Sequence, residues 1–515
     1  MLPKLDGEQM SRLAVSAHYL ETAFMSEVED AGLSKGSTIH DLENLDMEKP
    51  GLIRSKGLNV RCPHDHQMGA AYVDCLSGED HVGEATHFLS YSWSYTVGDI
   101  VDTLSDFCQA NGLNPKRTYI WICCLCVNQH RVAASKMSGM TASSPVDFFT
   151  IFGQRVKRIG HLLAMMAPWD RPTYLTRVWC IFELSYAHEN SCRVTVVMPP
   201  KEKELLELEL FGDDGLDNID VLYDALAKTR IQDAQASFQC DCVAILGWIE
   251  TSTGYASLNH RVNQLLRNWA RQVIGDLAKK HLSNPESDLA TARVCNQIGL
   301  ILDRNGEFDA ALEVHRRALR IRLDLLGPQN ARTAETWNSI GQALHGKGDN
   351  QHALLEYQKA LDIREEVLGP QHFDVAITYN GLGQVLLSQG LLERALICFR
   401  KAIPIFLLKR HTHHRLIATC YRNIGLVLQG QGQLVDALEH FQKALSFREL
   451  CLGPTHPDTA ASYCDIAALK KLRGDTIGAV TDYKKALPIL EVVLGPEHPA
   501  TQEVYEAIRS AHESA

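Results

Sequence analysis

The sequence lacks long apolar runs and clusters of basic residues. Nowhere do about 18 apolar residues run together without a charge, and the start, MLPKLDGEQMSRL, has no apolar signal core. We therefore expect no membrane span and a cytoplasmic location. The net charge is −11, with 51 basic and 62 acidic residues. Without a basic surface to bind phosphate backbones, nucleic acid is not expected as a partner.

Several other features are also missing. There is no long tract of Pro, Ser or Gly, and 45% of the residues are hydrophobic, so most of the chain should fold. The 15 cysteines show no regular spacing, which favours reduced thiols over a disulfide framework. No Gly-x-x-x-x-Gly-Lys-Ser loop is present, so a nucleotide-driven oligomerisation module is not expected.

A regular repeat runs through the C-terminal half. The tripeptide Leu-Gly-Pro begins at Leu326, Leu368, Leu452 and Leu494, at spacings of 42 or twice 42, with one degenerate copy near Arg410. Small residues keep the same step, in a glycine column and two alanine columns: Gly299, Gly341, Gly383 and Gly425; Ala311, Ala353, Ala395, Ala437 and Ala479; Ala318, Ala360, Ala402, Ala444 and Ala486.

Each repeat predicts a helical hairpin. The segment TAETWNSIGQALHGKGDNQHALLEYQKALDIREEVLG has a helix, a Gly-Asp turn, a second helix and a Gly-Pro stop. A single hairpin cannot bury both faces, so about five should stack into an all-α solenoid over residues 286–515. These residues resemble the tetratricopeptide repeat, in the long variety of kinesin light chains and nephrocystin-like proteins.

The resemblance implies a concave groove lined by the first helix of each hairpin. Asparagine can bind a peptide backbone and arginine a carboxylate, so a protein or peptide partner is expected, and an acidic peptide would suit. The alternative is that some of these side chains only solvate the inner face. The positions assigned to the groove are Arg293, Asn296, Glu335, Asn338, Gln342, Asn380, Gln384, Arg422 and Gln429.

Residues 81–200 predict a second kind of domain. Short β-rich runs alternate with helix-like segments: HFLSYSW, YIWICCLCVNQ, HLLAMMAPW and CRVTVVMPP. This alternation is typical of a parallel α/β sheet, for which a flavodoxin-like strand order is the economical choice. Ligands of such sheets bind at the carboxyl ends of the strands, where SYSWSYT and VNQHRV would lie.

Three segments carry a resemblance: FLSYSW at 88–93, YIWICCLCVNQ at 119–129 and RVWCIFEL at 177–184. Together they are similar to the fungal heterokaryon-incompatibility (HET) domain and, more distantly, to the Toll/interleukin-1 receptor (TIR) domain. Cys123 stands where the HET pattern has an aspartate, and the usual TIR loop after the second strand is not identifiable.

Many TIR domains hydrolyse NAD, and the resemblance makes Glu183 the catalytic carboxylate, with NAD as a possible substrate and no resident cofactor. A carboxylate can stabilise the oxocarbenium-like state of such a cleavage. The residues that would bind the substrate are Tyr91, Ser92, Trp93 and Trp179. Trp179 lies one helical turn from Glu183, and Tyr91 and Trp93 end the first strand. The alternative is a structural Glu183, paired with Arg177 or Arg171, and aromatic side chains packed in the core.

Clusters of histidine and cysteine do not predict a metal site. Cys62, His64 and His66 lack a second ligand pair at zinc spacing, as do Cys123, Cys124 and Cys126 before His130. The run with His411, His413 and His414 falls between two hairpins, where a solvated loop is expected.

The rest of the chain predicts a helical connector over 201–285, and an N-terminal segment, 1–80, without an assigned role but with a helix from Glu8 to Ala31. The sequence therefore favours an interaction scaffold or adaptor that binds a peptide in its repeat groove and signals or self-associates through the α/β domain. The alternative is an NAD glycohydrolase regulated by its repeats. A kinesin-linked cargo adaptor ranks below both, because no long N-terminal heptad run is present.

Overall fold

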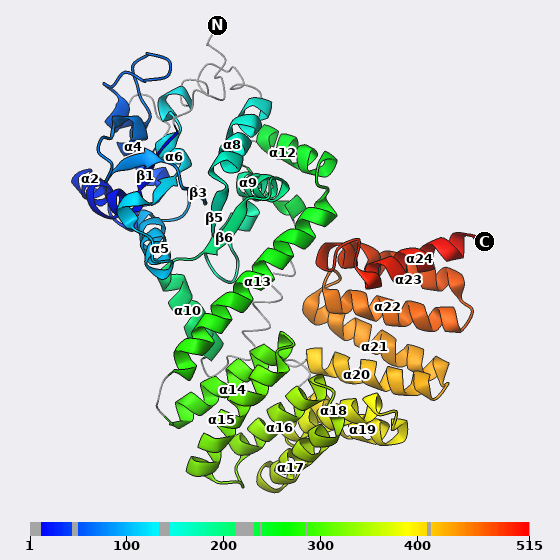
Figure 1. The fold of residues 1–515 in the computed structure, drawn as a ribbon. Coiled ribbons are helices and arrows are strands. Elements are labelled where there is room, and N and C mark those ends of the chain that lie inside the picture. The colour runs from blue at the N-terminus through cyan, green and yellow to red at the C-terminus, as the bar shows by residue number, and fades with distance from the viewer. Residues whose placement is uncertain are drawn as a thin grey trace. The chain divides into compact units, whose positions relative to one another are not determined.

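The computed structural model describes residues 12–43, 50–132, 145–211, 231–236, 239–283, 287–408 and 414–513. The chain divides into two compact units (Figure 1). The first comprises Met1–Leu206 and Thr229–Leu258, and the second Glu207–Lys228 and Asn259–Ala515. Within the ranges given above, no helix combines the length and the apolar character needed to cross a membrane.

The first unit is built on a six-stranded sheet with the order β2-β1-β4-β3-β5-β6. Its four parallel strands lie in the order second, first, third, fourth along the chain, as the flavodoxin-like prediction requires. β1 pairs antiparallel with β2 and β4 at one edge. The strands are β1 (Leu13–Ser16), β2 (Val82–Glu84), β3 (His87–Ser90), β4 (Tyr119–Trp121), β5 (His161–Met165) and β6 (Arg193–Val197).

Helices cover both faces of this sheet. α8 (Pro145–Ile159), α9 (Val178–Glu189) and α12 (Gln239–Thr251) pack on one another on one face. α5 (Val97–Ala110) lies on the other face, where Lys203 of α10 (Pro200–Phe211) forms an ion pair with Asp106 of α5 (Figure 1). Thr96 and Asp99 form a reciprocal capping box that starts α5 directly after the loop that follows β3.

The N-terminal segment belongs to the same unit. The predicted helix from Glu8 to Ala31 is wrong at its start, because Leu13–Ser16 is strand β1 and the helical turns begin only at Ala17. Edge pairing with β2 and β4 outweighs local helix propensity there. The short helices of the unit are α1 (Ala17–Tyr19), η1 (Leu20–Phe24), α2 (Met25–Asp30), α3 (Ile39–Leu42), α4 (Leu52–Gly57), η2 (Tyr72–Cys75), η3 (Pro115–Arg117), α6 (Cys123–Cys126), η4 (Thr173–Thr176) and η5 (Ile231–Asp233).

The second unit confirms the solenoid of five helical hairpins, which the structure describes over 287–408 and 414–513. In each hairpin we call the first helix A and the second helix B. A helices contact the A helices of neighbouring hairpins. The A and B helices are α14 (Leu289–Arg304) with α15 (Phe308–Leu326), α16 (Ala331–Gly346) with α17 (Asn350–Leu368), α18 (Phe373–Ser388) with α19 (Leu392–Leu408), α20 (His414–Gly430) with α21 (Leu434–Leu452), and α22 (Pro457–Leu472) with α23 (Thr476–Val493), followed by α24 (Pro499–Glu513).

The glycine column brings the two helices of a hairpin close together. A Cβ built on Gly383 would lie 2.5 Å from the ring of Phe399, and one on Gly425 would lie 2.6 Å from Phe441. An aromatic ring of helix B therefore packs directly on the backbone of helix A. This close contact explains why the sequence keeps glycine at this step while the alanine columns line the same interface.

A buried arginine joins one hairpin to the next at three junctions. Arg364 of α17 donates from Nη1 to the carbonyl of Asp374 at 2.9 Å and to Thr378 Oγ1 at 2.7 Å, both in α18. Arg322 makes the equivalent bonds to Arg332 O and Thr336, and Arg448 to Asp458 O and Ser462. All three arginines are at least nine-tenths buried, so each depends on these partners.

The degenerate repeat changes both partners of this bridge. In the register of the repeat, Phe406 takes the place of the arginine and Cys420 that of the hydroxyl. Both are fully buried, and the Phe406 ring packs on Phe373 with 5.4 Å between the centroids. The junction between α19 and α20 is therefore apolar, as is the last one, where Leu490 and Val504 occupy the two positions.

One more helix contacts both ends of the array. α13 (Tyr255–Leu282) precedes the first hairpin, and Arg317 of α15 donates to its last carbonyl, Leu282 O, at 2.5 Å. Near its start, His260 hydrogen-bonds to Val493 O at 3.2 Å, and Asn263 donates to Val492 O at 3.4 Å. These carbonyls end α23 and have no partner within that helix, so α13 caps the last hairpin.

We expect Arg364→Ala to destabilise the array by about 2–4 kcal/mol, because it leaves buried acceptors of α18 without their donor. The measurement is the free energy of unfolding by urea, followed by circular dichroism. The double variant Arg364→Phe with Thr378→Cys copies the apolar junction and should lose less than half as much. An equal loss in both variants would contradict the role given to the bridge.

Candidate functional site

The predicted catalytic residue of the α/β unit lies in a buried hydrogen-bonded group. Glu183 Oε2, on α9, is hydrogen-bonded to the hydroxyl of Ser90 at the carboxyl end of β3. Ser90 Oγ also donates to Tyr174 Oη at 3.0 Å, and Tyr174 Oη donates to the carbonyl of Cys180 at 3.2 Å. Only 7% of Glu183 is exposed. The strand end and α9 thus meet in packed surroundings.

The protonation of Glu183 follows from this burial. Burial raises the pKa of Glu183 to about 8, and the hydrogen bond with Ser90 opposes this rise only in part. At neutral pH the carboxyl is therefore mostly protonated. A protonated Glu183 can donate to Ser90, which donates to Tyr174, which donates to Cys180 O, so that every group of the chain is satisfied.

Two of the predicted substrate-binding aromatics meet at Cys123. The Cys123 thiol donates to Tyr91 Oη at 3.6 Å and accepts from Trp93 Nε1 at 3.5 Å. Burial raises the pKa of Cys123 to about 11, so it is a thiol at neutral pH. Ser92 bonds instead to Ser94 Oγ at 2.8 Å. Tyr91 and Ser92 are buried, whereas Trp93 is partly exposed.

Trp179 lies apart from this group. Its indole N–H donates to Asp241 Oδ2 on α12 at 3.2 Å, and its ring contacts Phe152 of α8 and Phe182. Glu183 and Trp179 therefore lie one turn apart on α9 but make different contacts. Glu183 contacts β3, whereas Trp179 contacts α8 and α12. Sequence reasoning missed Asp241 as the partner of Trp179, because nothing in the helix-like pattern of α12 indicates that it packs on α9.

The strand ends at which a ligand would be expected are occupied by side chains of the chain itself. Parallel order reverses between β3 and β5, the usual ligand position of such sheets. There Tyr95 Oη donates to Ala167 O at 2.9 Å and accepts from the backbone N–H groups of Ala167 and Tyr174, each at 3.2 Å. Tyr95 is buried. Its hydroxyl thus fills the backbone positions that a ligand could use.

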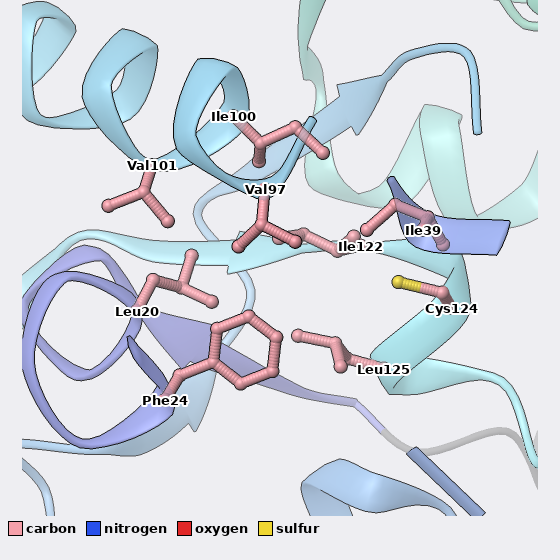
Figure 2. A pocket seen from close by; sticks show the side chains of 9 residues that line it. All are labelled: Leu20, Phe24, Ile39, Val97, Ile100, Val101, Ile122, Cys124 and Leu125. Atoms are coloured by element: carbon pink, nitrogen blue, oxygen red, sulfur yellow. The ribbon is translucent and has the colours of Figure 1, made fainter. Parts of the chain in front are cut away.

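A cavity does exist in this unit, but it is apolar. It lies between α5, η1 and the end of β4, has a volume of about 10 Å³ and is water-sized (Figure 2). No carboxylate, amide or basic group lines it, so it provides nothing to hold a nucleotide. Its lining consists of Leu20, Phe24, Ile39, Val97, Ile100, Val101, Ile122, Cys124 and Leu125.

The histidine and cysteine clusters have other contacts. Asp65, in the loop with Cys62 and His66, forms a bidentate ion pair with Arg131 at 2.6 and 3.0 Å. His64 Nε2 lies 3.9 Å from a carboxylate oxygen of Asp74. Across the part of the chain that the structure describes, no three His, Cys, Asp or Glu side chains are placed to hold a metal ion. His411 and His413 fall outside the described residues.

In the array, several predicted groove residues are bound to one another. Asn296 donates to Glu335 Oε1 at 3.0 Å, and Glu335 also accepts from Arg322 at 3.1 Å. Arg422 forms a bidentate ion pair with Asp465 of the next A helix, at 2.5 and 3.0 Å. These ion pairs neutralise the cations Arg322 and Arg422. Arg293 lies on α14 and is partly exposed.

Other predicted groove residues keep unused amide atoms. Gln342 is exposed, and Gln384 and Gln429 are partly exposed, each on an A helix. Asn338 Oδ1 accepts from Arg364 at 3.4 Å, whereas Asn380 Oδ1 is buried and has no hydrogen-bond partner in the described parts of the chain. The same is true of Asn423 Nδ2, on the next A helix.

Sequence reasoning missed Asn423. Its separation from Asn380 along the chain equals that between Arg422 and Asp465, which are 43 residues apart. That spacing places side chains of neighbouring A helices side by side, as the Arg422–Asp465 ion pair shows. A search for pairs at the repeat length plus one would have found it.

The tetratricopeptide repeat family model matches residues 288–366, 356–407 and 416–491. The C-terminal region is an array of tetratricopeptide repeats. No curated protein matches the chain. The tetratricopeptide region thus rests on the family match, the regular period of the sequence and the hairpins together.

Several solved structures are similar. One is a putative kinesin light chain with nearly identical TPR-like repeats from Podosopora anserina, at 16% identity over 38% of this chain and 93% of that one, with a TM-score of 0.34. Another is BtubC (BKLC) from P. vanneervenii, at 19% identity over 49% and 94%, TM-score 0.34. MamA from Desulfovibrio magneticus RS-1 gives 22% identity over 38% and 94%, TM-score 0.28. At these scores the likenesses support no inference about function.

The buried carboxyl makes stability depend on pH. The folded pKa of Glu183 is raised from 4.5 to about 8, so its stabilising neutral form is fully present below pH 4.5 and is lost as the pH rises through 8. Glu183→Gln should remove this term. We expect the variant to gain stability relative to wild type between pH 5 and pH 8, by at most about 1.4 kcal/mol per pH unit.

The measurement is urea unfolding at pH 5, 6, 7 and 8, followed by the fluorescence of the tryptophans, with Glu189→Gln as a control. Glu189 ends α9 and is exposed, so its replacement makes the same chemical change outside the buried group. A stability difference between Glu183→Gln and wild type that stays constant across this range would show that Glu183 is ionised in the folded chain.

Proposed function

We propose that the chain is an interaction scaffold whose tetratricopeptide array binds an extended peptide segment of a partner protein. The observation that carries this proposal is the presence of amide side chains on three consecutive A helices. Gln342, Gln384 and Gln429 reach the surface with no hydrogen-bond partner among the described side chains. Amides that both donate and accept suit a peptide backbone, whose N–H and C=O groups need both.

The charges of the groove residues refine the class of peptide. Arg422 is neutralised by Asp465, and Arg322, which lies beside Asn296 and Glu335, is neutralised by Glu335. An acidic peptide would have to compete with these internal carboxylates for the same guanidinium groups. We therefore propose a neutral, polar segment bound mainly through its backbone, rather than the acidic peptide that the sequence favoured.

The proposal is tested by selecting peptides from a display library of random 12-residue segments on the immobilised full-length chain. We expect enriched sequences that bind in solution and that lose at least tenfold in affinity on the double variant Asn380→Ala with Gln384→Ala. The matched control is Gln358→Ala, which removes an exposed amide from helix B of a neighbouring hairpin. Failure to enrich any peptide, or equal losses in variant and control, would contradict the proposal.

In this proposal the α/β unit is a protein module for signalling or self-association, related to TIR and HET domains. Its support is the arrangement of its strand ends, where Tyr95 and the bonded group of Ser90, Tyr174 and Glu183 occupy the ligand position. Sedimentation velocity across a hundredfold range of concentration tests self-association.

The second candidate function, NAD hydrolysis with Glu183 as the catalytic carboxylate, has one observation in its favour. The raised pKa of Glu183 would suit a group that exchanges a proton near neutral pH. Its burial and its bond to Ser90 weigh against direct contact with a substrate.

The experiment is release of nicotinamide from NAD by the full-length chain at high concentration, beside Glu183→Gln. On the scaffold proposal neither protein releases nicotinamide. Release by wild type that is lost in the variant, with both folded, would establish the second candidate instead.

A further inference from the structure

Three basic side chains form a row in the α/β unit that the proposed function does not use. His87, His161 and Arg193 are the first residues of the parallel strands β3, β5 and β6. The strand registers place His161 beside Arg193 and, one step before the pair Phe88–Leu162, His87 beside His161. Side chains in register on neighbouring strands point to the same face of the sheet. We propose that the two histidines make the packing of α5 acid-sensitive: α5 stays on the sheet while they are neutral, and its second half leaves when they are protonated.

The histidine pair, His87 and His161, lies against α5. The two ring centroids are 4.6 Å apart. The ring of Phe107, in the second half of α5, lies 5.4 Å from the His87 ring and 6.3 Å from the His161 ring. His87 is buried, whereas His161 is partly exposed, so protons from solvent can reach the pair from one side. An apolar ring therefore covers two groups that can each acquire a positive charge.

Each ring of the pair has one hydrogen bond. His87 Nδ1 bonds to Thr86 Oγ1 at 2.8 Å, and His161 Nε2 bonds to Thr195 Oγ1 at 2.9 Å. In the described parts of the chain these are the only hydrogen bonds of the two rings. A protonated histidine carries two N–H donors. Protonation would therefore leave one donor of each ring without an acceptor in the space under α5, which is unfavourable.

The charges around the pair are positive. Arg193 of β6 is the charged group that acts on both histidines. β4, the other strand beside β3, carries no charged residue. The nearby carboxylates have other partners, because Asp106 of α5 pairs with Lys203 of α10, and Glu84 of β2 pairs with Arg158 of α8. A proton on one histidine is thus repelled by Arg193, and protons on both also repel each other.

The protonation equilibria agree with this geometry. Burial first, and then the neighbouring cationic groups, lowers the pKa of His87 and that of His161 to about 4. The ordinary pKa of histidine is about 6.5. Between these two values the unfolded chain binds more protons than the folded chain, so the stability that is present above pH 6.5 is lost as the pH falls towards 4. Each histidine raises the unfolding constant by up to about tenfold per pH unit, and the pair by up to about a hundredfold.

The second half of α5 is the part that should move. Charged rings regain their hydration only when Phe107 leaves them, which also uncovers its neighbour Cys108, a buried free thiol. The pair lies at the amino ends of the strands, whereas Ser90 and Glu183 meet at the carboxyl end of β3. Mild acid therefore acts on the α/β unit without a direct effect on that group. The inference does not depend on peptide binding by the array.

The test compares wild type with the double variant His87→Asn/His161→Gln at pH 5, 6 and 7. Asparagine keeps an amide near the place of Nδ1 and glutamine near that of Nε2, so each can still bond to its threonine. Urea unfolding is followed by tryptophan fluorescence, because five of the seven tryptophans belong to the α/β unit. Between pH 6 and pH 5 we expect the unfolding constant of wild type to rise by up to about a hundredfold relative to the double variant. Glu183 is present in both proteins, so its opposite effect cancels.

The matched control is His40→Asn, which removes an exposed histidine of the same unit. An equal pH dependence in wild type and the double variant overturns the inference. So does an equal change in the control.

Two further measurements decide the matter if the double variant does not fold. Arg193→Gln removes an exposed cation from the edge strand, and should raise the stability at pH 5 while leaving that at pH 7 unchanged. On the wild-type chain, labelling of Cys108 by dithiodipyridine should become about tenfold faster from pH 7 to pH 5, relative to the buried Cys420 of the array. Equal stability changes at both pH values, or a constant labelling ratio, would show that acid does not release α5.

Discussion

A buried guanidinium sets the geometry of the array. Arg322, Arg364 and Arg448 are each removed from water, and a charge in that position is tolerated only when its donors are bonded. The next hairpin must therefore bring a backbone carbonyl and a hydroxyl to one point, which fixes its register and tilt relative to the last. Where the arginine is replaced by Phe406, the hydroxyl is replaced as well, by Cys420, so both sides of the junction are apolar. The same exchange explains the unused amide oxygen of Asn380. The Phe406 ring fills the place of the arginine side chain but offers no hydrogen-bond donor.

In the α/β unit, the side chains at the strand ends are packed and hydrogen-bonded within the unit rather than open to a ligand. Glu183, Tyr91 and the loop after β3 gather at the strand ends, where doubly wound sheets bind ligands, yet each is bonded to another part of the unit. Tyr95 and Tyr174 contribute their hydroxyls to backbone groups and to Ser90. In a site arranged in this way, the polar side chains have their hydrogen-bond partners within the unit and need no ligand. The array is the opposite case, because amides on its A helices remain without partners among the described residues.

Periodic features could be predicted from the sequence, and single contacts could not. The regular step of the repeat predicted the hairpins because glycine recurs in the first four A helices, where a ring of helix B packs on the backbone. Alternating strand and helix patterns gave the parallel order of β3 to β6. Strand β1 was missed because its four residues have no pattern of their own and depend on pairing at the sheet edge. Ser90 as the partner of Glu183 was missed because 93 residues separate them, and no local rule links a strand end to a helix face at that distance.

The contacts of α13 bear on how the array can be handled as a fragment. By sequence the repeats begin near residue 286, but His260 and Asn263 bond to the final carbonyls of α23, and Arg317 bonds to the last carbonyl of α13. A fragment cut at the first repeat would leave those groups to water and would expose the last hairpin at its end. The compact unit that contains the array thus extends upstream of the first repeat, since it comprises Glu207–Lys228 and Asn259–Ala515. In this protein the cap of α23 is encoded far upstream, since His260 precedes the carbonyl that it caps, that of Val493, by 233 residues.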